Sequence, residues 1–168
     1  MGDSIQNRVA ESGLITIDPA AFLPGQDIVP FDLRDFLFRG LILKEKDFRE
    51  AMAALDTSLY QGREVAVFCS ADAIIPMWAY MLVSSRLAPV AASVYAGTPE
   101  ELRKKMFLDN LSAIDADEFT DQRVVVKGCG DEPIGEWAYL EITRKLQPVV
   151  KSLMYGEACS AVTVFKRK

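Results

Sequence analysis

The sequence contains no histidine and only three cysteines, Cys69, Cys129 and Cys159, none of which belongs to a CxxC pair. Without histidine, the chain lacks Ser-His and Cys-His catalytic pairs and histidine-ligated metal sites of its own. Chemistry at a site of this chain therefore depends on thiols, carboxylates, lysines or a bound cofactor. Because the number of cysteines is odd, the sequence also argues against a framework of disulfides.

Long apolar runs and an excess of basic residues are missing as well. No apolar stretch reaches the ~18 residues expected of a membrane span, and the N-terminus lacks the basic and apolar regions of a signal peptide. The net charge is −5 and the pI is about 4.8, whereas nucleic-acid-binding surfaces need clustered Lys and Arg. We therefore expect a soluble cytoplasmic protein with reduced thiols that contacts neither nucleic acid nor membrane.

Apolar residues are abundant, and their pattern predicts the fold. Half of the 168 residues are hydrophobic, which is enough for one ordinary domain with a core. Segments with strand character alternate with helical segments, which is typical of α/β proteins. The strand segments are 14–17, 64–68, 92–96, 123–127 and 161–165; the helical segments are 44–55, 76–87, one beginning at Thr98, and 134–154, which Pro148 divides.

We predict a single α/β domain over residues 1–168. It is expected to be a layered sandwich with a mixed, mainly parallel sheet flanked by helices. The N-terminal segment 1–60 is mixed in character and is expected to pack on the same core. The sharpest local signal is the helix start at Thr98, where Pro99 suits the first helical position and Glu101 completes a capping box.

The cysteines lie close to the ends of predicted strands. Cys69 directly follows the strand 64–68, and Cys129 follows the strand 123–127 after one glycine. Ligands of open parallel sheets collect beyond the carboxyl ends of the strands, so both thiols are expected at that edge. Cys159 precedes the last strand and lies on the same edge if that strand is antiparallel, but on the opposite edge if it is parallel.

Three converging thiolates suit a soft metal, since zinc and iron–sulfur clusters are both held by cysteine. Our leading hypothesis is a metal site of Cys69, Cys129 and Cys159 that binds zinc or an iron–sulfur cluster. A water molecule, a substrate, a ligand from another protein, or a carboxylate such as Asp72 or Glu157 would complete the coordination.

Two alternatives stay open, and with them the question whether the protein is an enzyme. In the first, Cys69 is a nucleophile on a strand-to-helix turn, activated by a helix N-terminus or by a cation such as Lys127. In the second, the protein is a non-enzymatic binding or scaffold protein, because free cysteine often behaves as a small buried hydrophobic residue.

Several segments carry a resemblance to a known family. These are Asn7-Arg8-Val9 with Ser12-Gly13-Leu14, the stretch from Phe38 to Arg49, Cys69 to Pro76 with Trp78-Ala79-Tyr80, Lys127-Gly128-Cys129, and Lys151 to Glu157 with Cys159-Ser160. In these segments the chain resembles the bacterial domain-of-unknown-function family 2480. The resemblance implies a cytoplasmic single-domain protein of unestablished activity, and all three cysteines lie within the matching segments.

The resemblance also implies a role in cluster assembly, because members of the family are encoded near iron–sulfur assembly genes in some genomes. The partners that we expect are therefore a protein of iron–sulfur assembly and, as an alternative, a second copy of this chain in a homo-oligomer.

Overall fold

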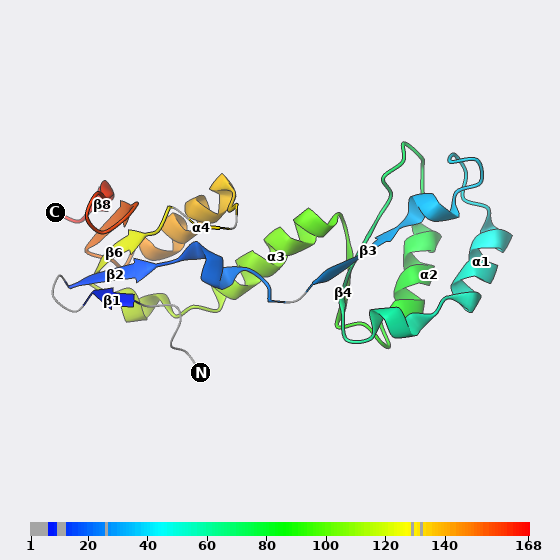
Figure 1. Cartoon of the computed structure of the whole chain (residues 1–168), viewed down its shortest axis with the longest axis horizontal. Helices are drawn as coiled ribbons and strands as arrows, with labels where there is room; N and C mark the ends of the chain where they lie inside the picture. The colour runs from blue at the N-terminus through cyan, green and yellow to red at the C-terminus, as the bar shows by residue number, and fades with distance from the viewer. Residues whose placement is uncertain (1–6, 10–12, 26, 129, 132) are drawn as a thin grey trace. The chain divides into compact units, whose positions relative to one another are not determined.

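The chain divides into two compact units in the computed structural model, which describes residues 7–9, 13–25, 27–128, 130–131 and 133–168. Unit 1 consists of the ranges 1–23 and 106–168, and unit 2 of the range 24–105. Each unit has one β-sheet (Figure 1). The predicted α/β fold with mainly parallel strands is confirmed, but the strands form two sheets instead of one. That the two units make up a single domain stays a prediction.

Over its described residues, unit 1 has a sheet of five strands in the order β1-β2-β6-β7-β8. The strands are β1 (Asn7–Val9), β2 (Leu14–Ile17), β6 (Arg123–Val126), β7 (Ser152–Tyr155) and β8 (Val162–Lys166). β2 pairs with β6 and β6 with β7 in parallel, whereas β1 and β8 are antiparallel to their neighbours. The carboxyl ends of β2, β6 and β7 therefore lie at one edge of the sheet.

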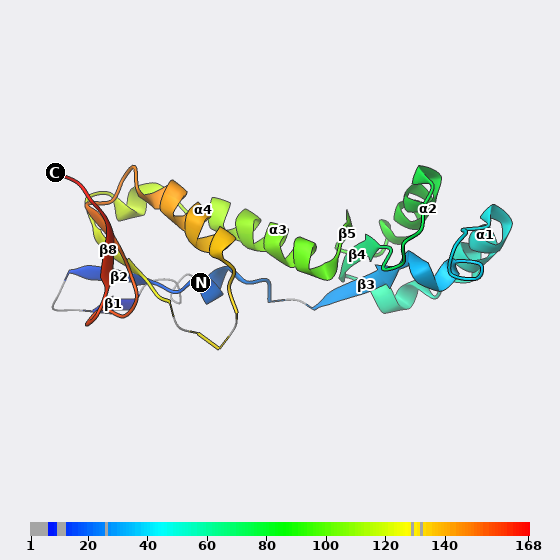
Figure 2. The same cartoon turned by 90° about the horizontal axis from the view of Figure 1, so that it is seen from above.

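Helices α3 (Pro99–Ser112, of which residues from 106 on belong to unit 1) and α4 (Glu136–Leu146) lie side by side in unit 1 (Figure 2). Alternate strand residues face the core, as the two-residue period of a strand requires. Phe107 of α3 makes edge-to-face contacts with Phe22 and Trp137 there. The buried cluster contains Ile15, Ile17, Phe22, Phe107, Leu111, Phe119, Val124, Val126, Ala138, Ile142, Leu146, Val150 and Leu153.

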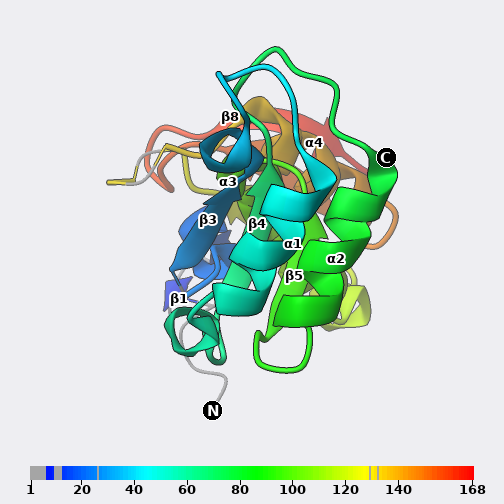
Figure 3. The same ribbon diagram turned by 90° about the vertical axis from the view of Figure 1, so that its right-hand side faces the viewer.

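Among the described residues of unit 2, three strands form a sheet in the order β3-β4-β5, and all of them are parallel. They are β3 (Ile28–Asp32), β4 (Glu64–Phe68) and β5 (Ser93–Ala96); α1 (Glu45–Ala54) and α2 (Met77–Leu87) lie side by side against them (Figure 3). Phe48 and Met52 of α1 share a buried core with Val65 and Val67 of β4 and with Val83 of α2.

In the part of the chain that the structure describes, four short 3₁₀-helices connect these elements, and each one begins after an aspartate. The carboxylate of that aspartate accepts a hydrogen bond at 2.9–3.0 Å from the backbone N–H two residues further on. Aspartate is favoured in this position because it satisfies a backbone donor that the helix leaves unpaired. The helices are η1 (Pro19–Phe22), η2 (Leu33–Phe36), η3 (Thr57–Tyr60) and η4 (Ala116–Phe119), with Asp18, Asp32, Asp56 and Asp115 as caps.

The predicted strands appear within one residue of their expected bounds, and the predicted capping box is present. Thr98 N–H donates to Glu101 Oε2 at 2.8 Å, and Glu101 N–H donates to Thr98 Oγ1 at 3.2 Å. The predicted helical segment 134–154 is wrong in its second half, because α4 ends at Leu146 and β7 follows. Among the described residues, no helix has the length and apolar character needed to cross a membrane.

Candidate functional site

A cavity of about 380 Å³ lies at the carboxyl edge of the unit 1 sheet. Its lining residues come from the segments that follow β2 and β6 and from the start of α4. Ligands of open α/β sheets bind in the crevice outside the carboxyl ends of the strands. The residues that line the cavity are Asp18, Pro19, Ala20, Lys127, Gly128, Gly130, Pro133, Ile134 and Tyr139.

Two opposite charges border the cavity. Lys127 Nζ lies 3.4 Å from Asp18 Oδ2, and both side chains are partly exposed. The backbone fixes both residues, since Lys127 N–H donates to Ile17 O at 2.9 Å and Asp18 Oδ1 accepts the N–H of Ala20 at 2.9 Å. An ammonium has three donors, so Lys127 can still donate to a bound molecule while it stays paired with Asp18.

Two tyrosines close the same edge. The rings of Tyr139 and Tyr155 pack edge to face with centroids 5.5 Å apart, and the Tyr139 hydroxyl donates to Lys127 O at 3.5 Å. A Cβ on Gly128 would fall on the Tyr155 hydroxyl. Glycine is therefore needed at position 128, because it lets the Tyr155 ring lie directly over the backbone beside position 129.

Two of the three cysteines belong to the loops at this edge. Cys129 lies outside the described residues, but its neighbours Gly128 and Gly130 both line the cavity. Cys159 is exposed and lies between β7 and β8, where Ser160 N–H donates to Glu157 O at 2.9 Å. Because β8 is antiparallel to β7, the connection that carries Cys159 is at the carboxyl end of β7. Of the two directions that the sequence left open for the last strand, the antiparallel one is present.

Cys69 belongs to unit 2 and has a different environment. It directly follows β4, is partly buried against the core of that unit, and its Sγ donates to Ala71 O at 3.5 Å. Burial raises the pKa of the Tyr80 hydroxyl, and the electrostatic effect of the nearby Cys69 raises it further. Cys69 is thus a partly buried thiol that lies beside Tyr80 and the backbone of Ala71.

Beside Cys69, Asp32 at the end of β3 organises the loop. Its carboxylate accepts hydrogen bonds from both Oγ and N–H of Ser70 and from the N–H of Arg34. Partial desolvation raises the pKa of Asp32, but these hydrogen bonds together with the charge of Arg34 outweigh it, so the pKa lies below its usual value of 3.8. Asp32 is a residue that the sequence analysis did not single out. The sequence offers only a general signal for it, since the side chain of an aspartate often accepts the backbone N–H two residues further on.

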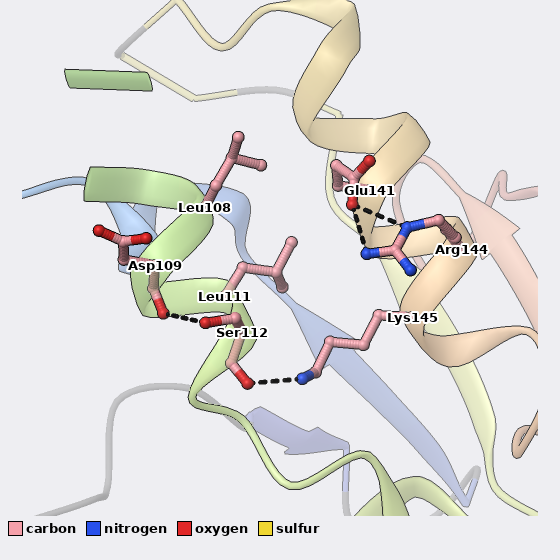
Figure 4. Close-up of a pocket in the computed structure, with 7 residues that line it drawn as sticks. All are labelled: Leu108, Asp109, Leu111, Ser112, Glu141, Arg144 and Lys145. Carbon is pink, nitrogen blue, oxygen red and sulfur yellow. Dashed lines mark hydrogen bonds and ion pairs between the residues drawn. The ribbon is translucent and has the colours of Figure 1, made fainter. Parts of the chain in front are cut away.

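A larger cavity of about 610 Å³ lies between α3 and α4 (Figure 4). Its polar groups are paired with one another. Lys145 Nζ donates to Ser112 O at 2.8 Å, and Arg144 binds the carboxylate of Glu141 at 2.8 Å. This cavity is a groove between two helices whose charges are already satisfied, so it is a weaker candidate than the edge of the sheet.

The described residues contain no group of three or more His, Cys, Asp or Glu side chains placed to hold a metal ion. Cys129 is not among those residues, so this finding concerns the other candidate ligands only. In the described part of the chain, Cys159 and Glu157 belong to unit 1 and Cys69 and Asp72 to unit 2.

By its fold, the chain is an α/β protein that carries a polar cavity and two thiol-bearing loops at the carboxyl edge of a mixed sheet. It belongs to the family of proteins of unknown function DUF2480, whose family model matches residues 3–167. No curated protein and no solved structure matches the chain.

Proposed function

We propose that the carboxyl edge of the unit 1 sheet is a thiolate site, in which Cys129 and Cys159 bind zinc or an iron–sulfur cluster. The observation that supports this best is the strand pairing. β6 and β7 are parallel neighbours, and β8 returns antiparallel to β7. The loop that contains Cys129 and the loop that contains Cys159 are therefore adjacent at one edge.

The residues near these thiols fit a soft metal. A carboxylate lies two positions from each cysteine, Asp131 after Cys129 and Glu157 before Cys159, and both carboxylates are exposed. Zinc accepts cysteine sulfur together with carboxylate oxygen. Gly130, directly after Cys129, has no side chain to cover its backbone N–H, and a Cβ placed there would meet no atom within 4 Å. A backbone N–H of this kind can stabilise a thiolate by donating to it.

The hypothesis of three cysteines adds Cys69 as a third ligand. Cys69 belongs to unit 2, whereas Cys129 and Cys159 follow neighbouring strands of unit 1, so we treat the pair Cys129 and Cys159 as the necessary part of the site. Cluster assembly or delivery in the cytoplasm, together with a protein partner of that pathway, is the role that we propose. Reduced thiols in that compartment are available as metal ligands.

The test is metal analysis and a visible spectrum of protein that has been purified without oxygen or chelator. The same measurements are made on Cys129→Ser, Cys159→Ser and Cys69→Ser variants, each checked for folding by circular dichroism. We expect near-stoichiometric zinc or iron in the wild type and its loss in the first two variants. Loss in Cys69→Ser as well would extend the site to three thiols. A folded wild type that holds no metal, even after reconstitution with zinc or with iron and sulfide, would overturn the proposal.

A thiol-dependent enzyme with Cys69 as nucleophile is the second candidate. Its support is the place of Cys69, directly at the carboxyl end of the central strand of unit 2. Native alkylation distinguishes the two candidates. Preferential modification of the partly buried Cys69 over the exposed Cys159 would indicate an activated thiol, whereas faster reaction of Cys159 follows from exposure alone.

A further inference from the structure

The carboxyl edge of unit 2 exposes large apolar side chains on two loops. The first loop, 37–44, exposes Phe38, Leu41 and Ile42, and the second loop, 69–77, exposes Ile74 and Met77, with Met81 one turn further along α2. Ile74 is 93% exposed, which is extreme for an isoleucine. We call these six residues the apolar edge. Figures 1 and 3 both show the two loops at the same end of the sheet.

Both loops are held in place by the core of unit 2. Leu43 of the first loop and Ile75 of the second are buried in the same cluster. The first loop turns at Arg39 and Gly40, which both have positive φ, and Phe38 and Ile42 form an antiparallel bridge across the turn. A turn with two successive positive φ values suits a hairpin, and here it presents Leu41 to solvent. The apolar residues are thus displayed by a fixed framework.

The two loops of the apolar edge carry charges of opposite sign. Arg39 and Lys44 of the first loop lie over the ring of Phe38, and neither forms an ion pair within the described residues. The first loop, 37–44, has no acidic residue, whereas the second has Asp72, which is exposed, and no basic residue. One half of the edge is therefore basic and the other half acidic.

We propose that the apolar edge is the contact surface of a homodimer with two-fold symmetry. In such a contact, the first loop of one copy faces the second loop of the other, and the same contact occurs twice. Arg39 and Lys44 of each copy then meet Asp72 of the other, and Leu41 and Ile42 meet Ile74 and Met77. An anionic lipid surface would complement only the basic half and would leave Asp72 facing like charge.

The size of the apolar edge agrees with a second copy of the chain as its partner. A fully exposed Leu, Ile or Met side chain offers on the order of 100 Å², so the six residues expose roughly 400 Å² on each copy. That is as large as the largest apolar patch on a typical monomer. It is also about half of the ~800 Å² that each partner buries in a standard interface, where somewhat more than half of the area is apolar.

The experiment is sedimentation equilibrium of the full chain over a range of concentrations, with a matched pair of variants. Leu41 and Leu59 are both 66% exposed, but Leu59 belongs to η3, which precedes β4 and so lies at the opposite edge of the sheet. We expect a dimer of the 18.6 kDa chain, weakened at least about tenfold by Leu41→Asp and unchanged by Leu59→Asp. Circular dichroism confirms that both variants are folded.

A charge exchange tests the symmetry. Asp72→Lys alone should weaken the dimer, and the further changes Arg39→Asp and Lys44→Glu should restore it, because the two loops then exchange signs. A wild type that is monomeric at all concentrations, or a dimer that Leu41→Asp leaves intact, would overturn the proposal. Co-sedimentation of a monomeric wild type with vesicles rich in phosphatidylserine, lost in Leu41→Asp, would assign the apolar edge to a membrane surface instead. These outcomes do not depend on the thiolate site, because none of the variants alters Cys129 or Cys159.

Discussion

Units 1 and 2 use the same local framework for different surfaces. In each unit, a strand leads into an aspartate that caps a 3₁₀-helix, and a neighbouring parallel strand is followed closely by a cysteine. In unit 1, Asp18 pairs with Lys127 beside a polar cavity. In unit 2, Asp32 binds Ser70 next to the apolar edge. The framework places the aspartate, whereas the residues of the surrounding loops make the edge polar in unit 1 and apolar in unit 2.

Substitutions in the two hydrophobic cores should have the largest effects on stability and should distinguish the two units. Phe107 in unit 1 and Phe48 in unit 2 are both fully buried and contact other aromatic rings. Each change to Ala should lower the free energy of unfolding by about 3–5 kcal/mol. Because each core cluster lies within one unit, we expect amide hydrogen exchange to accelerate mainly in β2, β6 and β7 for Phe107→Ala, and mainly in β3, β4 and β5 for Phe48→Ala. Equal acceleration in both units would instead indicate one cooperative domain, as the sequence suggests.

The glycines that flank Cys129 give the second contrast. Gly128→Ala places a methyl group on the Tyr155 hydroxyl, whereas a Cβ on Gly130 meets no atom within 4 Å. We expect Gly128→Ala to lower the free energy of unfolding by about 1–2 kcal/mol through displacement of Tyr155, and Gly130→Ala to change it little. Urea denaturation measures both values. If Gly128→Ala is neutral, the Tyr155 ring does not hold the backbone beside Cys129.

The carboxylate of Asp32 gives the smallest effect, and this effect depends on pH. Its folded pKa lies below 3.8, so the stability that it contributes is present above pH 3.8 and is lost as the pH falls through the folded pKa. Asp32→Ala should lower the free energy of unfolding by about 1 kcal/mol at neutral pH, because a cap is lost.

Urea denaturation at neutral pH and near pH 3 measures the difference between Asp32→Ala and the wild type. The difference should shrink at the lower pH. Ser70→Ala is the matched control: it removes one of the donors and should give a smaller change. A difference that stays constant with pH would show that the cap acts through geometry and not through its charge.

Strong local signals in the sequence were enough to predict most elements. The capping box at Thr98 and the valine-rich run before Lys127 both lead to elements that the structure contains. Three strands were missed: β1, β3 and β7. β1 is only three residues long, too short for a two-residue period to show. β3 contains Pro30, and proline within a segment usually argues against a strand. β3 is an edge strand, however, and an edge strand tolerates proline because the backbone groups on its outer side need no hydrogen-bond partner. β7 is only four residues long, and its apolar character cannot be distinguished from the end of a helix.

The candidate site could be predicted only in part. The position of a cysteine after a strand follows from local sequence, as for Cys69 after β4. Whether Cys159 shares an edge with the loop of Cys129 depends on the direction of β8 relative to β7. The sequence does not show this direction, because it predicts the end of a helix at β7, which follows Pro148. The Lys127–Asp18 pair joins residues from distant parts of the chain, and it depends on the pairing of β2 with β6. No pattern within either segment shows that pairing.

Unit 1 consists of two ranges of the chain, 1–23 and 106–168, with unit 2 between them. This arrangement affects the order in which the two units can fold during synthesis. All three strands of unit 2 emerge before β6, so unit 2 can become ordered on a nascent chain while β2 still lacks its neighbour. Leu14 of β2 can pair with Arg123 of β6 only after Arg123 has been synthesised. Contacts between residues so distant in sequence also form slowly. The edge that carries Cys129 and Cys159 is therefore assembled last. Under the proposed function, a metal ion or cluster would bind there only after translation of the C-terminal strands.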